Sequence, residues 1–568
     1  MITRNLDGTF GVKGASYDLL IRRNIVDVII CGTAFASLDI RTAVNATNED
    51  YTVTIDAEET IPILISVEEK QGKTVFTWTG KSSLWEKEYK LVCTYTRFRY
   101  YVKVKGQGHV DSVNYFSGNM AKPGFGSGYE FSEGFNPCKP YNAWEEYYFR
   151  ASVRCYRPSI YMCPPMFCYA FRCAGIGDRL ALGLVAQRGE HNFHSFNYNL
   201  SGWHNNCSGF YLTTDQDGHT IVDGEWTAPY IIGYSATDEF NAMQKYSDYY
   251  YASGIAKPRK AETIPRFWYG PLACGWIEQG GDPAGCREEV YERMIAQLKK
   301  NDLHPSAVII DDKWMTHYAT DIADPSKWPN LRAYVDRHHA EGINTMLWFM
   351  LWSKDGWDEK LCVLGNENAL EFDPSHLMCD PSHPEFVKNL DCALERMLSD
   401  AEGCYDCDGL KIDYAFANPK GKKVKTYSGK YGVELMYDMM EQIYRKAKEV
   451  KPTALINHSA CHPYFGHICD QARLHDYIPT DRYNLEDLSM RGCMFSIAMP
   501  GVLLDTDNSA FVSRRDTMRW QLNQQIVGVP DLYAVSPNAV LDFNEDDLGA
   551  IAEMWREYSA MVDAKYGM

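Results

Sequence analysis

The sequence lacks the long apolar segments that direct a chain into or across a membrane. Residues 1–7 contain no apolar core of the kind found in secretion signals. The apolar stretch at residues 25–38 is too short to span a bilayer and contains Asp27. The 18 cysteines are spread over a long chain without an export signal, which indicates reduced, mostly buried thiols and not a disulfide framework. We therefore expect a soluble, cytoplasmic protein with no membrane partner.

Basic residues are in deficit. The chain has 57 Lys and Arg against 75 Asp and Glu, a formal net charge of −18 with histidine neutral. Such a field repels polyphosphates and anionic lipid surfaces. No glycine-rich phosphate loop follows any of the expected strands. Nucleic acid is therefore excluded as an expected partner, and a nucleotide cofactor is disfavoured.

Internal repeats and low-complexity tracts are also missing, so the 568 residues should form ordinary globular domains. Up to residue 258, short alternating runs are separated by turn signals such as Gln71-Gly72 and Asp217-Gly218. This pattern predicts an antiparallel β-sandwich. A charged link containing Pro258 then interrupts the pattern. We place the boundary there, with an N-terminal β-sandwich domain at 1–258 and a second domain at 259–568.

In the second domain, short apolar runs alternate with helical periodicity. The expected strands are 267–276, 307–310, 344–351, 409–413, 454–457, 477–480, 501–504 and 531–533. The expected helices are 288–299, 331–339, 385–398, 433–448, 515–527 and 546–564. Eight strands, most of them followed by a helix, within roughly 300 residues predict a (β/α)8 TIM barrel and not an open doubly wound sheet.

Acidic residues follow four of these strands, at the end of the barrel where active sites lie. They are Asp311 and Asp312 after the second strand, Asp413 after the fourth, Asp481 after the sixth, and Asp505 and Asp507 after the seventh. A single aspartate at such a position could equally cap a helix, but four strand ends together favour a functional site. Two separate carboxyl groups at a barrel mouth, without a cofactor motif, are what glycoside hydrolysis requires.

Several short motifs occur along the second domain in a specific order. They are Asp311-Asp312-Lys313-Trp314, Trp328-Pro329-Asn330-Leu331 with Leu347-Trp348, Asp380-Pro381-Ser382-His383-Pro384, Asp408-Gly409-Leu410-Lys411-Ile412-Asp413, and Thr480-Asp481. In these motifs the chain resembles the α-galactosidases of glycoside hydrolase family 36, in the clan shared with family 27. The similarity runs from about residue 267 to the C-terminus, and the order of sandwich and barrel agrees.

The resemblance implies a retaining mechanism in which Asp413 is the nucleophile and Asp481 the acid/base, with their carboxyl groups about 5 to 6 Å apart. It also implies that Asp311 and Asp312 bind the 4- and 6-hydroxyls of galactose and that Lys411 binds sugar hydroxyls. Because Lys411 lies two residues before Asp413 on one strand face, we expect it to keep Asp413 ionised. The further substrate-binding candidates are Trp276, Trp314, Trp348, His458 and Cys461. We expect no metal and no cofactor.

The sequence departs from this family at the sides of the expected pocket. Ile412 stands where tryptophan is usual, residues 351–354 replace a Glu-Pro pair, and residues 457–463 replace a Cys-x-x-Gly-Gly-x-Arg loop. The reaction class therefore follows more directly than the sugar. We predict an α-galactosidase acting on an α-linked galactoside or a related oligosaccharide or glycoconjugate. The alternatives are an α-N-acetylgalactosaminidase, another α-glycosidase or transglycosidase of the clan, or a non-catalytic carbohydrate-binding protein. The sequence is compatible with a homo-oligomer.

Two cysteine-containing segments invite other interpretations. Residues 458–469 hold three histidines and two cysteines, which are zinc-ligand types but lack a clean paired spacing. Sugar contacts or local packing explain them better. Cys404 and Cys407 form a lone C-x-x-C without a partner pair, which favours incidental thiols over redox chemistry.

Overall fold

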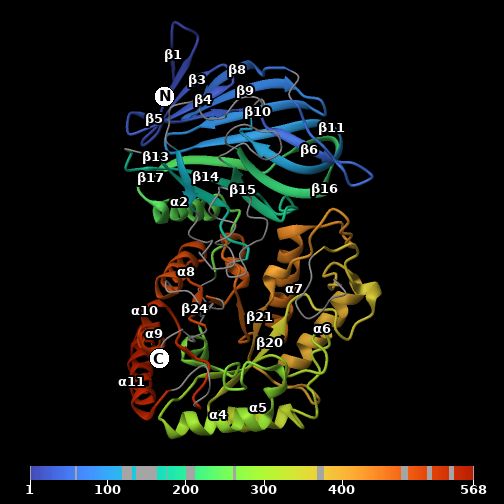
Figure 1. The fold of residues 1–568 in the computed structure, drawn as a ribbon, viewed down its shortest axis with the longest axis vertical. Coiled ribbons are helices and arrows are strands. Elements are labelled where there is room, and N and C mark those ends of the chain that lie inside the picture. Colours follow the sequence, from blue (N-terminus) through green and yellow to red (C-terminus); the bar gives the residue numbers. More distant parts are fainter. Residues whose placement is uncertain are drawn as a thin grey trace.

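The computed structural model describes residues 2–57, 60–117, 131–135, 163–173, 176–199, 211–259, 264–367, 377–474, 484–507, 514–536 and 543–566. Figure 1 shows two stacked parts, with the β-rich N-terminal part above the barrel. The predicted fold class, an antiparallel β-sandwich followed by a (β/α)8 barrel, is confirmed.

The N-terminal part consists of two packed antiparallel sheets. The five-stranded sheet contains β1 (Ile2–Arg4), β2 (Phe10–Lys13), β3 (Asp18–Arg22), β4 (Ile25–Ile30) and β5 (Thr33–Asp39). The larger sheet has twelve described strands: β6 (Ala43–Thr47), β7 (Val53–Thr54), β8 (Ile63–Lys70), β9 (Lys73–Lys81), β10 (Glu86–Cys93), β11 (Phe98–Tyr115), β12 (Phe131–Phe135), β13 (Cys168–Cys173), β14 (Arg179–Val185), β15 (Ser195–Asn199), β16 (Tyr211–Thr227) and β17 (Tyr230–Ala236). Alternate residues of β10 are buried, as period-two patterning requires, and Phe10 packs edge-on against Phe76 between the sheets.

The two predicted turns have different outcomes. Gln71 and Gly72 both have positive φ and join β8 to β9, so this hairpin turn is confirmed. Asp217 and Gly218 also have positive φ, but they lie inside β16, where the register against β11 shifts opposite Asp111. The two residues adopt the positive φ angles of a turn, but here they form a bulge inside a long strand and not the end of a hairpin.

The barrel strands are short and almost wholly buried. They are β18 (Leu272–Cys274), β19 (Ala307–Ile310), β20 (Asn344–Met350), β21 (Gly409–Asp413), β22 (Leu455–His458), β23 (Gln471–Arg473), β24 (Leu503–Asp505) and β25 (Asp531–Leu532). Consecutive strands pair in parallel, and β25 pairs with β18. A parallel bridge between Asp505 and Val529 closes the remaining gap, so the eight strands form a nearly complete barrel.

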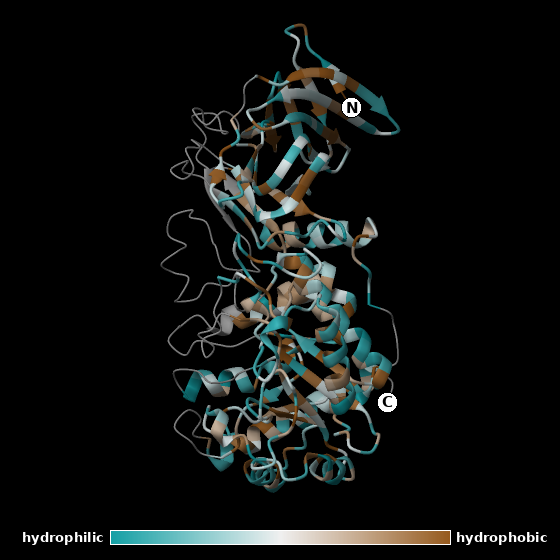
Figure 2. Cartoon of the chain, turned by 90° about the vertical axis from the view of Figure 1, so that its right-hand side faces the viewer, coloured by the Kyte–Doolittle hydropathy of each residue, from teal (hydrophilic) through white to brown (hydrophobic). Residues whose placement is uncertain are grey.

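The α-helices in the described part of the chain are α2 (Glu239–Ala252), α3 (Arg266–Tyr269), α4 (Glu288–Lys300), α5 (Leu331–His339), α6 (Pro384–Leu398), α7 (Gly432–Val450), α8 (Asn484–Ala498), α9 (Arg514–Gln521), α10 (Gln524–Val527) and α11 (Glu545–Tyr566). Local sequence explains their limits: Asn330 caps α5 by accepting from the Ala333 N–H, and Pro384 occupies the first turn of α6. Helix α2 contacts β13, β14 and β17 on one side and α8 on the other, so it lies between sheet and barrel. Figure 2 shows hydrophobic strands inside each part and many hydrophilic residues on the outer helices.

Two expectations need correction. The expected first strand, 267–276, contains the helical turn α3 and only three strand residues in β18. The expected sixth strand, 477–480, lies outside the described residues, and the strand between β22 and β24 is Gln471–Arg473. Its three residues Gln-Ala-Arg carry no apolar run, so hydropathy could not reveal it. None of the helices in the described part of the chain has the length and apolar character of a membrane span.

Candidate active site

Asp413 is the last residue of β21 and lies at the carboxyl end of the barrel, with its side chain 14% exposed. Its Oδ1 accepts hydrogen bonds from the backbone N–H of Tyr414 at 2.8 Å and from Nη2 of Arg473 at 2.8 Å. Its Oδ2 accepts one from the indole N–H of Trp348 at 3.2 Å. The carboxylate is therefore held in one orientation by donors from three chain segments while part of it still reaches solvent.

Lys411 contacts a different carboxylate from the one expected. Its Nζ lies 2.6 Å from Oδ2 of Asp311, and both side chains are 4% exposed. The thiol of Cys274 donates to the same oxygen at 3.0 Å. Burial alone would lower the pKa of Lys411, but the buried acidic groups around it, Asp311 foremost, together outweigh burial and raise that pKa well above the usual value. Arg473 is a cation that contacts Asp413.

Asp312 differs sharply from its neighbour Asp311. Burial raises the pKa of Asp312 to about 7, with further increases from Asp311 and Asp413. The Tyr318 hydroxyl donates to its Oδ2 at 3.3 Å, whereas its buried Oδ1 has no hydrogen-bond partner among the residues that the structure describes. A buried acceptor of this kind matches a hydroxyl donor on a bound molecule. Asp312 is therefore the better placed of the two predicted hydroxyl-binding acids, since Asp311 is occupied by Lys411.

Arg473, at the end of β23, joins the acids of two strands. Its side chain is fully buried and lies 2.8 Å from Asp413 and 3.1 Å from Asp507. Tyr533, just after β25, donates to Asp507 and accepts from Lys411 Nζ at 3.3 Å. A continuous polar chain thus runs from Asp311 through Lys411, Tyr533, Asp507 and Arg473 to Asp413. Sequence reasoning assigned no role to Arg473 or Tyr533. Tyr533 closes the expected strand 531–533, which was an available signal, whereas β23 has no apolar run that would mark Arg473 as a strand end.

A second pair of acids lies inside the barrel. Burial, together with Asp507, raises the pKa of Asp505 to about 6. Burial and Asp505 raise the pKa of Asp531 well above the usual range, and neither carboxyl oxygen of Asp531 has a hydrogen-bond partner among the described residues. Burial therefore favours the neutral form of this carboxyl group. Sequence reasoning placed Asp505 at a strand end but overlooked Asp531.

The other predicted residues divide into two groups. Trp348 contacts Asp413, and Trp276 lies partly exposed after β18. Trp314 and Cys461 are fully buried, and the Trp314 indole donates to the Trp348 carbonyl at 2.9 Å. His458 is also fully buried, and burial lowers its pKa to about 4. These last three side chains are fully buried in the structure, and their predicted role in binding a sugar stays a prediction.

Asp481 lies outside the described residues. The predicted distance between its carboxyl group and that of Asp413 therefore stays a prediction. Two histidines of the segment 458–469 form hydrogen bonds with tyrosines. The ring of His462 lies 3.1 Å from the Tyr246 hydroxyl, and that of His467 lies 2.9 Å from the Tyr437 hydroxyl. No group of three or more His, Cys, Asp or Glu side chains in the described part of the chain is arranged to hold a metal ion.

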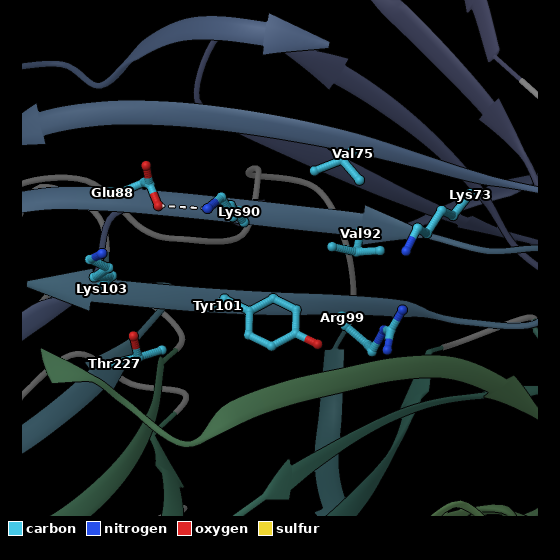
Figure 3. A pocket seen from close by; sticks show the side chains of 9 residues that line it. All are labelled: Lys73, Val75, Glu88, Lys90, Val92, Arg99, Tyr101, Lys103 and Thr227. Carbon is cyan, nitrogen blue, oxygen red and sulfur yellow. Dashed lines mark ion pairs between the residues drawn. The ribbon is translucent and has the colours of Figure 1, made fainter. Parts of the chain in front are cut away.

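A groove of about 360 Å³ lies elsewhere, on the outer face of β9, β10 and β11 (Figure 3). Four cationic side chains line it around Tyr101, and Glu88 pairs with Lys90 at 2.8 Å. The groove contains none of the predicted site residues and belongs to the N-terminal sheet. The barrel mouth therefore remains the candidate active site.

Comparisons with known proteins agree on the architecture. No family model and no curated protein matches the chain. Among solved structures, it is similar to a GH31 family sulfoquinovosidase from E. rectale in complex with the aza-sugar inhibitor IFGSQ, with TM-score 0.59, 11% identity, and coverage of 97% of this chain and 84% of that one.

Two α-galactosidase structures are similar as well. The galactosidase domain of the α-galactosidase-sucrose kinase AgaSK gives TM-score 0.52 and 11% identity over 99% of this chain and 86% of that one. TtGalA, an α-galactosidase from Thermus thermophilus in complex with p-nitrophenyl α-D-galactopyranoside, gives TM-score 0.51 and 14% identity over 90% and 94%. At these identities the likeness establishes a shared fold, and function must be argued from the site.

Proposed function

We propose that this chain is a retaining α-glycoside hydrolase and that Asp413 is its nucleophile. The observation that carries the proposal is the setting of Asp413, a partly exposed carboxylate at a barrel mouth fixed by Arg473 and Trp348. A nucleophile needs this combination of fixed direction and access to substrate. The shared fold of the sulfoquinovosidase and the α-galactosidases supports the same reaction class.

The proposed reaction has two displacements. The Asp413 carboxylate attacks the anomeric carbon, the bond from that carbon to the leaving oxygen breaks, and an acid gives its proton to that oxygen. We assign the acid to Asp481, on the family resemblance alone. Water then gives a proton back to the same group and attacks the anomeric carbon, which releases Asp413. Arg473 and the Trp348 N–H balance the charge that returns to Asp413 in this second step.

The proposed substrate is an α-galactoside. Asp312 has a buried acceptor oxygen to offer a sugar hydroxyl, and a site of this type rejects a sugar that leaves the acceptor unpaired. The loss amounts to about 1 to 3 kcal/mol, or roughly fivefold to 150-fold in kcat/KM. Galactose should therefore be favoured over glucose.

A panel of nitrophenyl α-glycosides tests the proposal. We expect the α-galactoside to give the highest kcat/KM, ahead of the α-glucoside and the α-N-acetylgalactosaminide. Equal or faster turnover of the α-glucoside would remove the galactose assignment and leave the reaction class standing. Binding of galactosides without turnover of any α-glycoside would instead indicate the non-catalytic alternative.

The nucleophile is tested with Asp413→Ala. This variant should lose turnover, and azide should restore it, because a small anion fits the space of the missing carboxylate and attacks from the same face. The product should be a glycosyl azide with the anomeric configuration opposite to that of the substrate. Asp336→Ala on α5, which removes an exposed carboxylate, is the matched control. Undiminished activity of Asp413→Ala would exclude Asp413 from the reaction.

A further inference from the structure

Two cysteines face each other directly in the segment that follows β20. Cys362 and Cys379 form an antiparallel bridge. The N–H of Val363 donates to the Met378 carbonyl at 2.8 Å, and the N–H of Asp380 donates to the Leu361 carbonyl at 2.8 Å. The hydrogen bonds therefore flank the cysteines without joining them, which identifies a non-hydrogen-bonded pair. In such pairs the Cα atoms lie about 4.5 Å apart and the side chains are closest.

This geometry suits a disulfide. The Cα separation of such a pair falls within the range of about 4.4 to 6.8 Å found for disulfides, and both side chains project from the same face of the ladder. Both residues are thiols in the structure and are buried, with exposures of 5% for Cys362 and 1% for Cys379. We propose that Cys362 and Cys379 form a reversible cross-strand disulfide when the protein meets a low-molecular-weight disulfide oxidant such as oxidised glutathione.

The chemistry balances with that oxidant alone. The Cys362 thiol, the more exposed of the two, loses its proton and attacks one sulfur of oxidised glutathione, which releases one glutathione thiolate. The Cys379 thiolate then attacks the Cys362 sulfur of the mixed disulfide and releases the second glutathione. Two protein thiols are oxidised to one disulfide, and one glutathione disulfide is reduced to two thiols.

The position of the pair connects it with the barrel mouth. The Cys379 thiol donates to the Ser353 carbonyl at 2.8 Å, and its N–H donates to the Trp352 carbonyl at 3.1 Å. The Trp352 indole in turn reaches the carbonyl of Ala415, two residues after Asp413. A disulfide here fixes the base of the loop behind β20 and restricts its unfolded ensemble. The proposal does not depend on the proposed function, because it concerns only the thiols.

Oxidation should be slow in the closed structure. Burial raises the pKa of the Cys379 thiol well above its usual value, Cys362, Asp321 and Asp380 add to the increase, and Lys354 opposes it. Only the thiolate reacts, so a higher pH should speed the step.

The sequence offers a clean assay. Trypsin releases residues 361–388 as one peptide, which contains Cys362 and Cys379 and no other cysteine. The full chain is incubated with oxidised glutathione at about pH 9, where more of a thiol is ionised, until the exposed Cys392 and Cys493 are fully modified. It is then unfolded, alkylated and digested. We expect the peptide to have lost two hydrogen atoms and to take up no alkyl group, and dithiothreitol should restore both sites.

Controls separate a specific pair from general opening. Cys93 is buried and lies alone in its tryptic peptide, residues 91–97, so it should stay fully alkylated. In Cys362→Ser, and separately in Cys379→Ser, the peptide should no longer show the two-hydrogen loss. The proposal is overturned if Cys362 and Cys379 both remain alkylated after the exposed cysteines have reacted. It is also overturned if Cys93 is oxidised to the same extent as the pair.

Discussion

At the scale of single residues, Asp311 and Asp312 show how neighbours in sequence acquire different chemistry. Asp311 is paired with Lys411 at 2.6 Å, whereas burial raises the pKa of Asp312 to about 7. The folded protein therefore holds a proton on Asp312 between about pH 4 and pH 7 that the unfolded chain releases. Stability is lost as the pH rises through this window, the opposite of the behaviour of a salt-bridged carboxylate.

This sign predicts the behaviour of Asp312→Asn. The amide cannot ionise, so the variant should exceed the wild type in free energy of unfolding by about 2 to 4 kcal/mol at pH 8, and the difference should vanish near pH 4. Urea unfolding at both pH values measures it. Asp336→Asn, at an exposed carboxylate of α5, is the control and should leave the pH profile unchanged. A variant less stable than the wild type at pH 8 would refute this account of Asp312.

At the scale of elements, β23 marks the limit of sequence reasoning. The sequence predicts strands such as β19 because four consecutive residues are apolar, and it predicts α6 because apolar residues recur at helical spacing. In β23 the side chains of Gln471 and Arg473 contact buried polar partners, and only Ala472 belongs to the apolar core. Its identity depends on Asp413 and Asp507 from other strands, and a local pattern cannot encode such distant partners. For the same reason, the sequence could not reveal that Lys411 contacts Asp311.

Arg473→Met tests the role of this strand. The apolar side chain would leave the fully buried Asp507 and the largely buried Asp413 without their shared cation, at a cost of about 3 to 5 kcal/mol in stability. Adding Asp507→Asn to this variant should recover part of the lost stability, because one of the two buried carboxylates without its cation is then replaced by a neutral amide. Chemical denaturation of both single variants and the double variant gives the coupling. If Asp507→Asn brings no recovery in the Arg473→Met background, the ion pair is not coupled to folding as described.

At the scale of the whole molecule, the sandwich and the barrel meet through a defined set of polar contacts. The N-terminus of α7 receives the segment before β15: the N–H of Val433 donates to the Phe193 carbonyl at 3.0 Å, and that of Glu434 donates to the His191 carbonyl at 3.0 Å. The Glu434 carboxylate accepts from the N–H of Gly189 at 3.0 Å. Periodicity predicted both parts, but it could not predict this junction, because each contact joins residues more than 200 positions apart.

The junction between the Phe193 segment and α7 depends on Gly432, the first residue of that helix. Gly432 has φ +58°, and a Cβ there would lie 2.1 Å from the Phe193 carbonyl oxygen. Gly429, three residues before α7 begins, has φ +74° but no atom within 4 Å of an added Cβ. Gly429→Ala should therefore cost only the backbone strain of about 1 to 2 kcal/mol. Gly432→Ala should cost at least about 1 to 3 kcal/mol more, because the Phe193 segment must move away from α7.

Thermal unfolding measures the difference in stability between the two variants, and limited proteolysis should show earlier cleavage between the two parts only in Gly432→Ala. Equal effects of the two substitutions would mean that strain alone matters and that the contact at Phe193 does not hold the sandwich on the barrel.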